Sequence, residues 1–147
     1  MKGAIVSAFL VATMFGAFVG AEEPKVRPAA SKLDGAWVLT TQKNGDVKEQ
    51  TAVPEGEKQI KLLTDGRYTW TWLNDGKVQV GLGGRYTLQG EKYTEYIEYA
   101  IGDSFAQFVG KSAEFTWSLE GGKWHHKGVV KVNNADYVID EVWERAK

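Results

Sequence analysis

The chain has 147 residues, with 18 Lys or Arg against 19 Asp or Glu, and a formal net charge of −1 at pH 7. A chain of this length forms one domain that buries its own core, and the near-neutral balance excludes nucleic-acid binding through a basic face. Cysteine is absent, which excludes disulfides, thiol catalysis and lipid anchoring through a cysteine.

Residues 1–21 have the order of a secretory signal peptide. A basic start at Lys2 precedes an apolar stretch, and the small residues Val19-Gly20-Ala21 form a cleavage site. A transmembrane anchor is the alternative, but the apolar stretch is short for a helix that spans a bilayer. We predict cleavage after Ala21, a secreted or periplasmic location, and no membrane association of the mature chain. The lack of cysteine favours a bacterial protein.

Residues 22–32 are charged and carry prolines, which is typical of a flexible leader. The domain then occupies residues 33–147. Within it, period-two alternation between glycine- or asparagine-containing turns predicts short strands. In chain order these strands are 36–42, 58–63, 67–73, 77–82, 85–88, 93–101, 113–119, 124–132 and 137–145, with a weak additional strand at 47–51.

A short helix is predicted over 105–109, capped by Asp103 or Ser104 and ended by Gly110. The glycine-rich segment 81–84 is expected to form a bulge or a barrel corner. Consecutive antiparallel hairpins predict an all-β fold, a small closed up-and-down barrel of about eight strands with one short helix, because closure removes the exposed sheet edges.

The predicted strands carry aromatic residues on one face and mostly polar residues on the other, so the aromatic faces should point inward. The residues predicted to line the interior are Trp70, Trp72, Tyr86, Glu95, Tyr99, Trp117, His126, Glu141 and Trp143. Buried carboxylates are costly unless they are paired. Two interpretations remain, a filled core in which the polar groups bond one another, or a cavity whose polar atoms meet a ligand.

Gly35-x-Trp37 on the first strand resembles the signature of lipocalins and fatty-acid-binding proteins, the calycin group. The resemblance implies that Trp37 closes one barrel end under a basic residue of the last strand, for which Arg145 is the candidate. Residues 83–87 and 93–99, together with Glu141-x-Trp143, resemble more closely an uncharacterised lipocalin-like domain family of secreted bacterial proteins, over most of residues 33–146.

The chain departs from the fatty-acid-binding pattern at two places. That group holds a ligand carboxylate with Arg-x-Tyr on the last strand, whereas Glu141-x-Trp143 stands in the comparable place. A glutamate repels a carboxylate. The helical lid of that group has no counterpart in residues 43–57, which lack a helical period, so fatty acids are poor candidate ligands.

Catalytic and metal-binding motifs are not evident in the sequence, and we predict neither a metal nor a cofactor. His125 and His126 are neighbours on a strand and face opposite sides, so they cannot chelate one ion. His126 with Glu95 or Glu141 could act as an acid/base pair, although a core histidine bonded to a glutamate is the simpler interpretation. We therefore predict a binding module for a small apolar or aromatic molecule, with a small enzyme or a filled-barrel structural domain as alternatives. No sequence feature specifies an oligomeric state.

Overall fold

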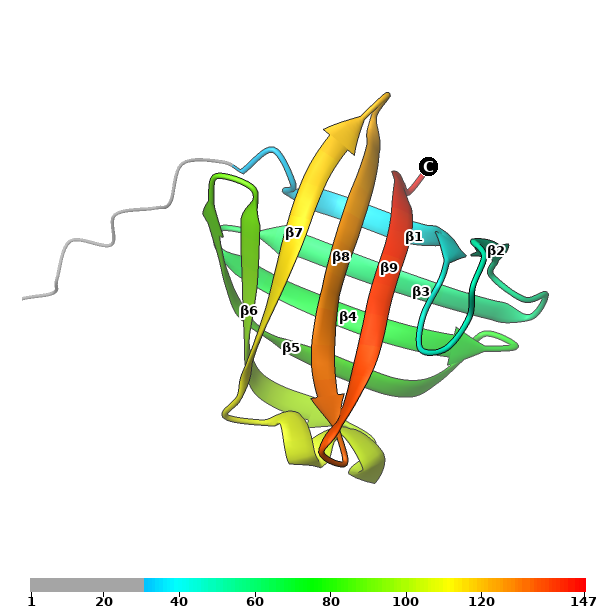
Figure 1. The fold of residues 1–147 in the computed structure, drawn as a ribbon, viewed down its shortest axis with the longest axis vertical. Coiled ribbons are helices and arrows are strands. Elements are labelled where there is room, and N and C mark those ends of the chain that lie inside the picture. Colours follow the sequence, from blue (N-terminus) through cyan, green and yellow to red (C-terminus); the bar gives the residue numbers. More distant parts are fainter. Residues whose placement is uncertain (1–30) are drawn as a thin grey trace, which may run out of the picture.

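Eight long strands pair in chain order and the last pairs with the first, which closes an antiparallel barrel and confirms the predicted fold class (Figure 1). The computed structural model describes residues 31–147, so the predicted signal peptide and most of the predicted leader lie outside the described residues. The strands are β1 (Gly35–Gln42), β3 (Glu57–Thr64), β4 (Arg67–Asn74), β5 (Lys77–Gln89), β6 (Lys92–Ile101), β7 (Ser112–Glu120), β8 (Lys123–Val132) and β9 (Ala135–Arg145). A two-residue strand, β2 (Thr51–Ala52), pairs with the end of β1.

Tight turns connect neighbouring strands where the sequence supplies residues that accept a positive φ. In the turn between β3 and β4, φ is 49° at Asp65 and 73° at Gly66. In the turn between β4 and β5, φ is 47° at Asp75 and 74° at Gly76. Asn133-Asn134, between β8 and β9, has 50° and 65°. Positive φ at both central residues favours the two-residue turn that matches the twist of a hairpin. The meander therefore follows from local turn chemistry.

The glycine-rich segment lies inside one continuous strand, β5, although the sequence predicted two strands at 77–82 and 85–88. The predicted bulge is present, because the pairing of β5 with β6 shifts between Gly83 and Gly84. A Cβ on Gly84 would lie 1.9 Å from the carbonyl oxygen of Tyr96. Glycine at this position therefore permits the close approach of β6 and does not interrupt the strand.

Within residues 31–147 the one helical segment is a 3-10 helix, η1 (Asp103–Phe108), and none of its residues is buried. The predicted capping by Asp103 or Ser104 is wrong, because the helix begins after Gly102, at φ 92°, without a side-chain cap. The weak strand predicted at 47–51 is also displaced, since only Thr51 and Ala52 pair with β1.

Two bulges reverse which face of the sheet a residue occupies. In β1 the partners shift from Leu39–Trp143 to Thr41–Val142, so Gln42 faces the interior opposite Glu141. A one-residue offset of this kind inverts the alternation that follows it.

In β6, Gly84 pairs with Ile97 and Gly83 pairs with Tyr99, which leaves Glu98 as the extra residue. The prediction that Tyr99 faces the interior is therefore contradicted. Its ring covers the outer side of Gly83, and the residue is 41% exposed.

One half of the barrel, which we call the closed half, is filled by side chains. Its buried cluster consists of Leu33, Trp37, Leu39, Leu63, Tyr68, Tyr86, Tyr93, Phe115, Trp124 and Trp143. The end is sealed at β1, where the guanidinium carbon of Arg145 lies 4.0 Å from the centre of the Trp37 ring. Arg145 also donates hydrogen bonds to the carbonyl oxygens of Lys32 and Asp34.

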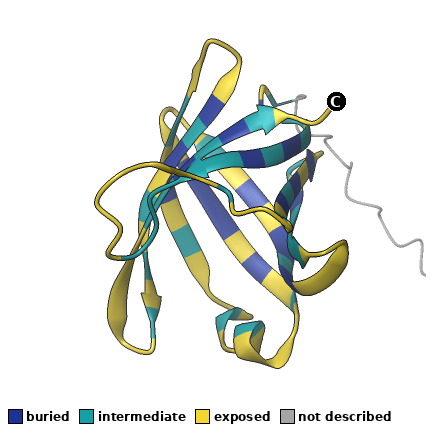
Figure 2. Ribbon diagram, turned by 90° about the vertical axis from the view of Figure 1, so that its right-hand side faces the viewer, coloured by how far each residue is buried: buried dark blue, intermediate teal, exposed yellow. Residues whose placement is uncertain are grey.

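The other half, which we call the open half, lies toward η1 and the β8–β9 turn. Val80 is buried there, but the other inward-facing residues Trp70, Trp72, Leu82, Val130 and Ile139 are only partly buried. Figure 2 shows the same division, with buried segments gathered toward the end that carries the C-terminus and exposed segments toward η1. The predicted filled core therefore describes the closed half, whereas several inward-facing side chains of the open half remain partly exposed.

Candidate functional site

Lys61 of β3 places an ammonium group inside the barrel. Its side chain is 4% exposed, and its Nζ atom lies 2.6 Å from Oε1 of Glu95. The hydroxyl of Tyr93 donates to the same oxygen at 2.8 Å. The rings of Tyr93, Phe115, Trp124 and Trp143 surround the ammonium, with centres 5.2 to 5.8 Å away. The buried charge is thus offset by an opposite charge and by cation–π contacts.

A second buried carboxylate, Glu141 of β9, accepts hydrogen bonds on both oxygens. Asn44 donates to Oε1 at 3.0 Å and the Trp143 indole donates to Oε2 at 3.1 Å. Nδ1 of His126 lies 3.2 Å from the same Oε2. Glu141 therefore accepts three hydrogen bonds and joins β8, β9 and the loop after β1.

The electrostatics of the pair favour a neutral His126. Burial lowers the pKa of His126 and the charge of Lys61 lowers it further, which outweighs the opposite effect of Glu141. Burial alone would raise the pKa of Glu141, but its bond to His126, the charge of Lys61 and the amide of Asn44 lower it overall. The neutral imidazole then donates from Nδ1 to the carboxylate, and Nε2 is left as an acceptor.

A row of side-chain hydrogen bonds follows the inner wall of the barrel over the neighbouring strands β9, β1, β3 and β4, and we call it the polar layer. From Glu141 it passes to Asn44, whose amide also bonds Gln42 at 3.2 Å. Gln59 donates to the same Gln42 oxygen at 3.4 Å, and the Trp70 indole donates to Gln59 at 3.0 Å. The polar layer therefore lines one side of the interior, while Trp70, Val130 and Ile139 pack directly against the closed cluster.

Three buried polar atoms of the closed half have no hydrogen-bond partner among the residues that the structure describes. They are the Tyr68 hydroxyl, Nε1 of Trp124 and Nε2 of His126. Burial raises the pKa of Tyr68, and the charge of Glu95 raises it further, so the hydroxyl stays protonated and able to donate. Two donors and one acceptor are thus held among apolar rings around Lys61.

The open half presents aromatic rings whose polar atoms are already bonded. Nε1 of Trp72 donates to Oε2 of Glu57 at 3.3 Å, as Nε1 of Trp70 does to Gln59. Phe105 of η1 lies against Trp70, with ring centres 5.5 Å apart. Because both indole N–H groups are turned to β3, the remaining ring surface offers apolar and π contacts.

The structure separates the residues that the sequence predicted to line one space. Tyr86, Glu95, Trp117, His126, Glu141 and Trp143 lie in the closed half, Trp70 and Trp72 lie in the open half, and Tyr99 lies outside. Tyr86 and Trp117 hold the closed end together, because Tyr86 bonds Asp34 at 2.7 Å and Trp117 bonds the carbonyl of Gly90 at 3.0 Å. Burial raises the pKa of Tyr86 to about 12.

Sequence reasoning missed Lys61, Gln42, Asn44 and Gln59. Lys61 and Gln59 face inward although Ile60 and Leu62 alternate with them, and Leu62 is exposed. The alternation of apolar residues in β3 would place Ile60 and Leu62 inside and the two polar side chains outside, so it does not predict the observed arrangement. Gln42 faces inward because of a bulge, which period-two counting does not register.

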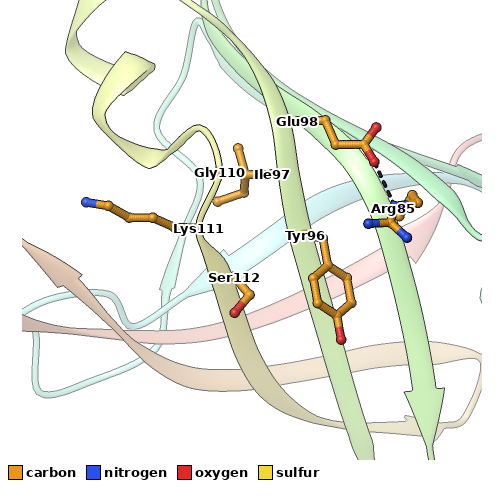
Figure 3. Close-up of a pocket in the computed structure, with 7 residues that line it drawn as sticks. All are labelled: Arg85, Tyr96, Ile97, Glu98, Gly110, Lys111 and Ser112. Carbon is orange, nitrogen blue, oxygen red and sulfur yellow. Dashed lines mark hydrogen bonds and ion pairs between the residues drawn. The ribbon is translucent and has the colours of Figure 1, made fainter.

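The two clearest hollows on the described residues are shallow and involve the outer face of the sheet. One, of about 230 Å³, lies between β6 and the start of β7, beside Tyr96 and Lys111 (Figure 3). Its Arg85 is held by Glu98 at 2.7 Å. The other, also about 230 Å³, lies beside Tyr99 and Leu62. Neither concentrates polar groups in the way the barrel interior does.

Residues 31–147 contain no helix whose length and apolar character would let it cross a membrane. Within the same residues, no group of three or more potential metal ligands comes together.

Comparison with known proteins supports the fold. No protein-family model matches the chain, and no curated protein matches it significantly. The structure is similar to that of a lipocalin-like protein from Bacteroides uniformis, with a TM-score of 0.53 and 13% sequence identity over 79% of this chain and 100% of that chain. At this identity the likeness concerns the fold alone, and it confirms the lipocalin-like barrel predicted from the sequence.

Proposed function

We propose that the protein is a secreted binding module that holds a small apolar or aromatic molecule in the open half of its barrel. The observation that carries the proposal is the pair of partly exposed tryptophans, Trp70 and Trp72, inside a barrel whose other half is filled. Large aromatic side chains on a concave surface with a few fixed polar groups are typical of small-molecule sites.

The polar layer supports this location. It lines the inner wall beside the open half, and its groups bond one another, so a ligand does not have to satisfy them. An apolar body can therefore rest on the polar layer without leaving a buried donor or acceptor unpaired.

The acid/base alternative has less support. His126 is 1% exposed and Glu141 is 6% exposed, and both contact the closed cluster. A substrate would need to reach side chains that are almost fully buried. We propose that the pair has a structural role.

A neutral fluorescent probe, N-phenyl-1-naphthylamine, tests the site. We expect saturable binding that quenches tryptophan emission, and we expect Trp72→Ala to weaken it at least about tenfold, which corresponds to about 1.4 kcal/mol. Tyr99→Ala is the matched control, because Tyr99 was predicted inside and lies outside. Absence of saturable binding, or equal losses in both variants, would remove the proposal.

Export rests on residues 1–21, which lie outside the described residues. We expect N-terminal sequencing of the exported protein to begin at Glu22. Recovery of the mature pool with Met1 intact would contradict the secreted location without affecting the binding site.

A further inference from the structure

The charges inside the barrel are unbalanced. Among the described residues, the charged side chains classed as buried are Lys61, Glu95 and Glu141, since His126 is neutral there. Glu57, at the mouth of the open half, adds a partly buried carboxylate. Three carboxylates thus stand against one ammonium, and the interior is net negative.

The single interior ammonium is not free to bind an anion. Lys61 already contacts Glu95 at 2.6 Å, and four aromatic rings enclose it. A ligand carboxylate would have to displace Glu95 and leave that buried charge uncompensated, which costs several kcal/mol. The interior therefore selects against anionic head groups.

Glu57 differs from the other two carboxylates in its partners. No Lys, Arg or His of the described residues lies within ion-pair distance of it. Trp72 donates the hydrogen bond that Glu57 does accept, at 3.3 Å. The carboxylate is thus held beside the edge of an indole ring and retains the capacity to accept more hydrogen bonds.

We propose that the ligand of the open half is a positively charged amphiphile, an amine or quaternary ammonium on an apolar or aromatic body, with its cation held by Glu57 and Trp72. This inference rests on the proposed function and specifies the chemistry of its ligand. The carboxylate supplies charge attraction, and the face of the indole, distinct from the N–H edge that bonds Glu57, is where the cation would make a cation–π contact. The apolar body then extends toward Trp70, Leu82 and Ile139, whose side chains are partly exposed.

Competition among three amphiphiles with the same tail tests the inference. Dodecylammonium, dodecanol and dodecanoate, each below its critical micelle concentration, are used to displace N-phenyl-1-naphthylamine at pH 7. We expect dodecylammonium to displace the probe at a concentration at least about tenfold lower than dodecanoate, with dodecanol between them. Displacement by dodecanoate at an equal or lower concentration would overturn the inference and leave the binding site standing.

The position of the cation is tested by Glu57→Gln. We expect this variant to reduce the preference for dodecylammonium over dodecanol to about twofold or less, because the amide keeps the hydrogen bond from Trp72 but carries no charge. Glu55→Gln is the matched control, since Glu55 is exposed in the turn before β3. An unchanged preference in Glu57→Gln would show that the cation is held elsewhere. If the probe itself fails to bind the wild-type protein, the proposed function fails.

Discussion

In the closed half of the barrel the indoles of Trp37, Trp124 and Trp143 are 0–1% exposed and pack on one another or on neighbouring rings. In the open half Trp70 and Trp72 remain partly exposed, although Trp70 also packs against Phe105 of η1 and against the buried cluster. The same residue type therefore serves stability in the closed half and is available to a ligand in the open half. The two roles differ because side chains from the facing strands cover the indoles in the closed half and leave them partly uncovered in the open half.

The largest effect should come from Trp37→Ala. Truncation of this ring removes the seal between β1 and Arg145, and we expect a loss of about 3–5 kcal/mol in unfolding free energy, the usual cost of deleting a buried large aromatic. Denaturant melts measure it. A loss below about 1 kcal/mol would mean that the closed half does not carry the stability.

Lys61→Met should cost about 3 kcal/mol, because it leaves Glu95 buried without its cation. The double variant Lys61→Met/Glu95→Gln removes both charges, and we expect it to recover much of that loss. If the double variant is no more stable than the single one, the ion pair is not what balances the centre of the closed half.

Acid should weaken the closed half through His126. Its folded-state pKa lies below the ordinary value of 6.5, so the unfolded chain binds a proton first as the pH falls. The contribution of His126 to the free energy of unfolding is then fully present above about pH 7 and declines as the pH falls through 6.5. The total loss is about 1.4 kcal/mol for each unit by which the folded-state pKa lies below the unfolded-state pKa. The lowered pKa of Glu141 acts in the same direction at lower pH.

Denaturant midpoints recorded from pH 8 to pH 5 measure this dependence. His126→Asn should flatten it, whereas His125→Asn, on the outer face, should not. Equal slopes in the two variants would place the titrating group elsewhere.

The bond between Glu141 and His126 gives a smaller, local readout. Glu141→Gln removes the interaction that raises the pKa of His126, so the titration midpoint seen by NMR should fall. Glu114→Gln, exposed on β7 beside Lys92, should leave it unchanged. A rise of the midpoint in Glu141→Gln would show that the imidazole is not bonded to this carboxylate.

The smallest stability effect belongs to the open half. Trp72→Ala should lower the free energy of unfolding by less than about 1 kcal/mol. The ring is only partly buried, and its N–H group bonds Glu57, which is itself partly exposed. The same denaturant melts apply. A cost comparable to that of Trp37→Ala would mean that the open half is also a packed core and would weaken the binding proposal.

Alternation predicted the inward faces of β4, β8 and β9, because those strands keep regular pairing where Tyr68, His126 and Trp143 lie. It failed at Tyr99, since the extra residue Glu98 inverts the face beyond it. It also gave no sign of Gln42, whose position depends on the shift in β1. The glycines at 81–84 did indicate irregular pairing in β5, but the extra residue lies on the partner strand β6, whose own sequence gives no sign of it.

The electrostatic centre could not be predicted for a related reason. Lys61 and Glu95 lie on β3 and β6, which are not neighbours in the sheet, and they meet only across the barrel interior. The sequence suggested a buried Glu95 and a buried His126, but the cation that compensates the first and lowers the pKa of the second is visible only after closure.

Closure of the barrel joins segments from opposite ends of the domain. Thr40 bonds the carbonyl of Val142, 102 positions away, and Arg145 bonds that of Lys32, 113 positions away. Contacts of such long sequence separation slow folding. During synthesis or export, β1 has no partner for its β9 side until the last strand is released, and until then the edges of β1 and β8 are exposed to other chains. Premature termination before β9 therefore yields an aggregation-prone open sheet, with neither half of the barrel formed.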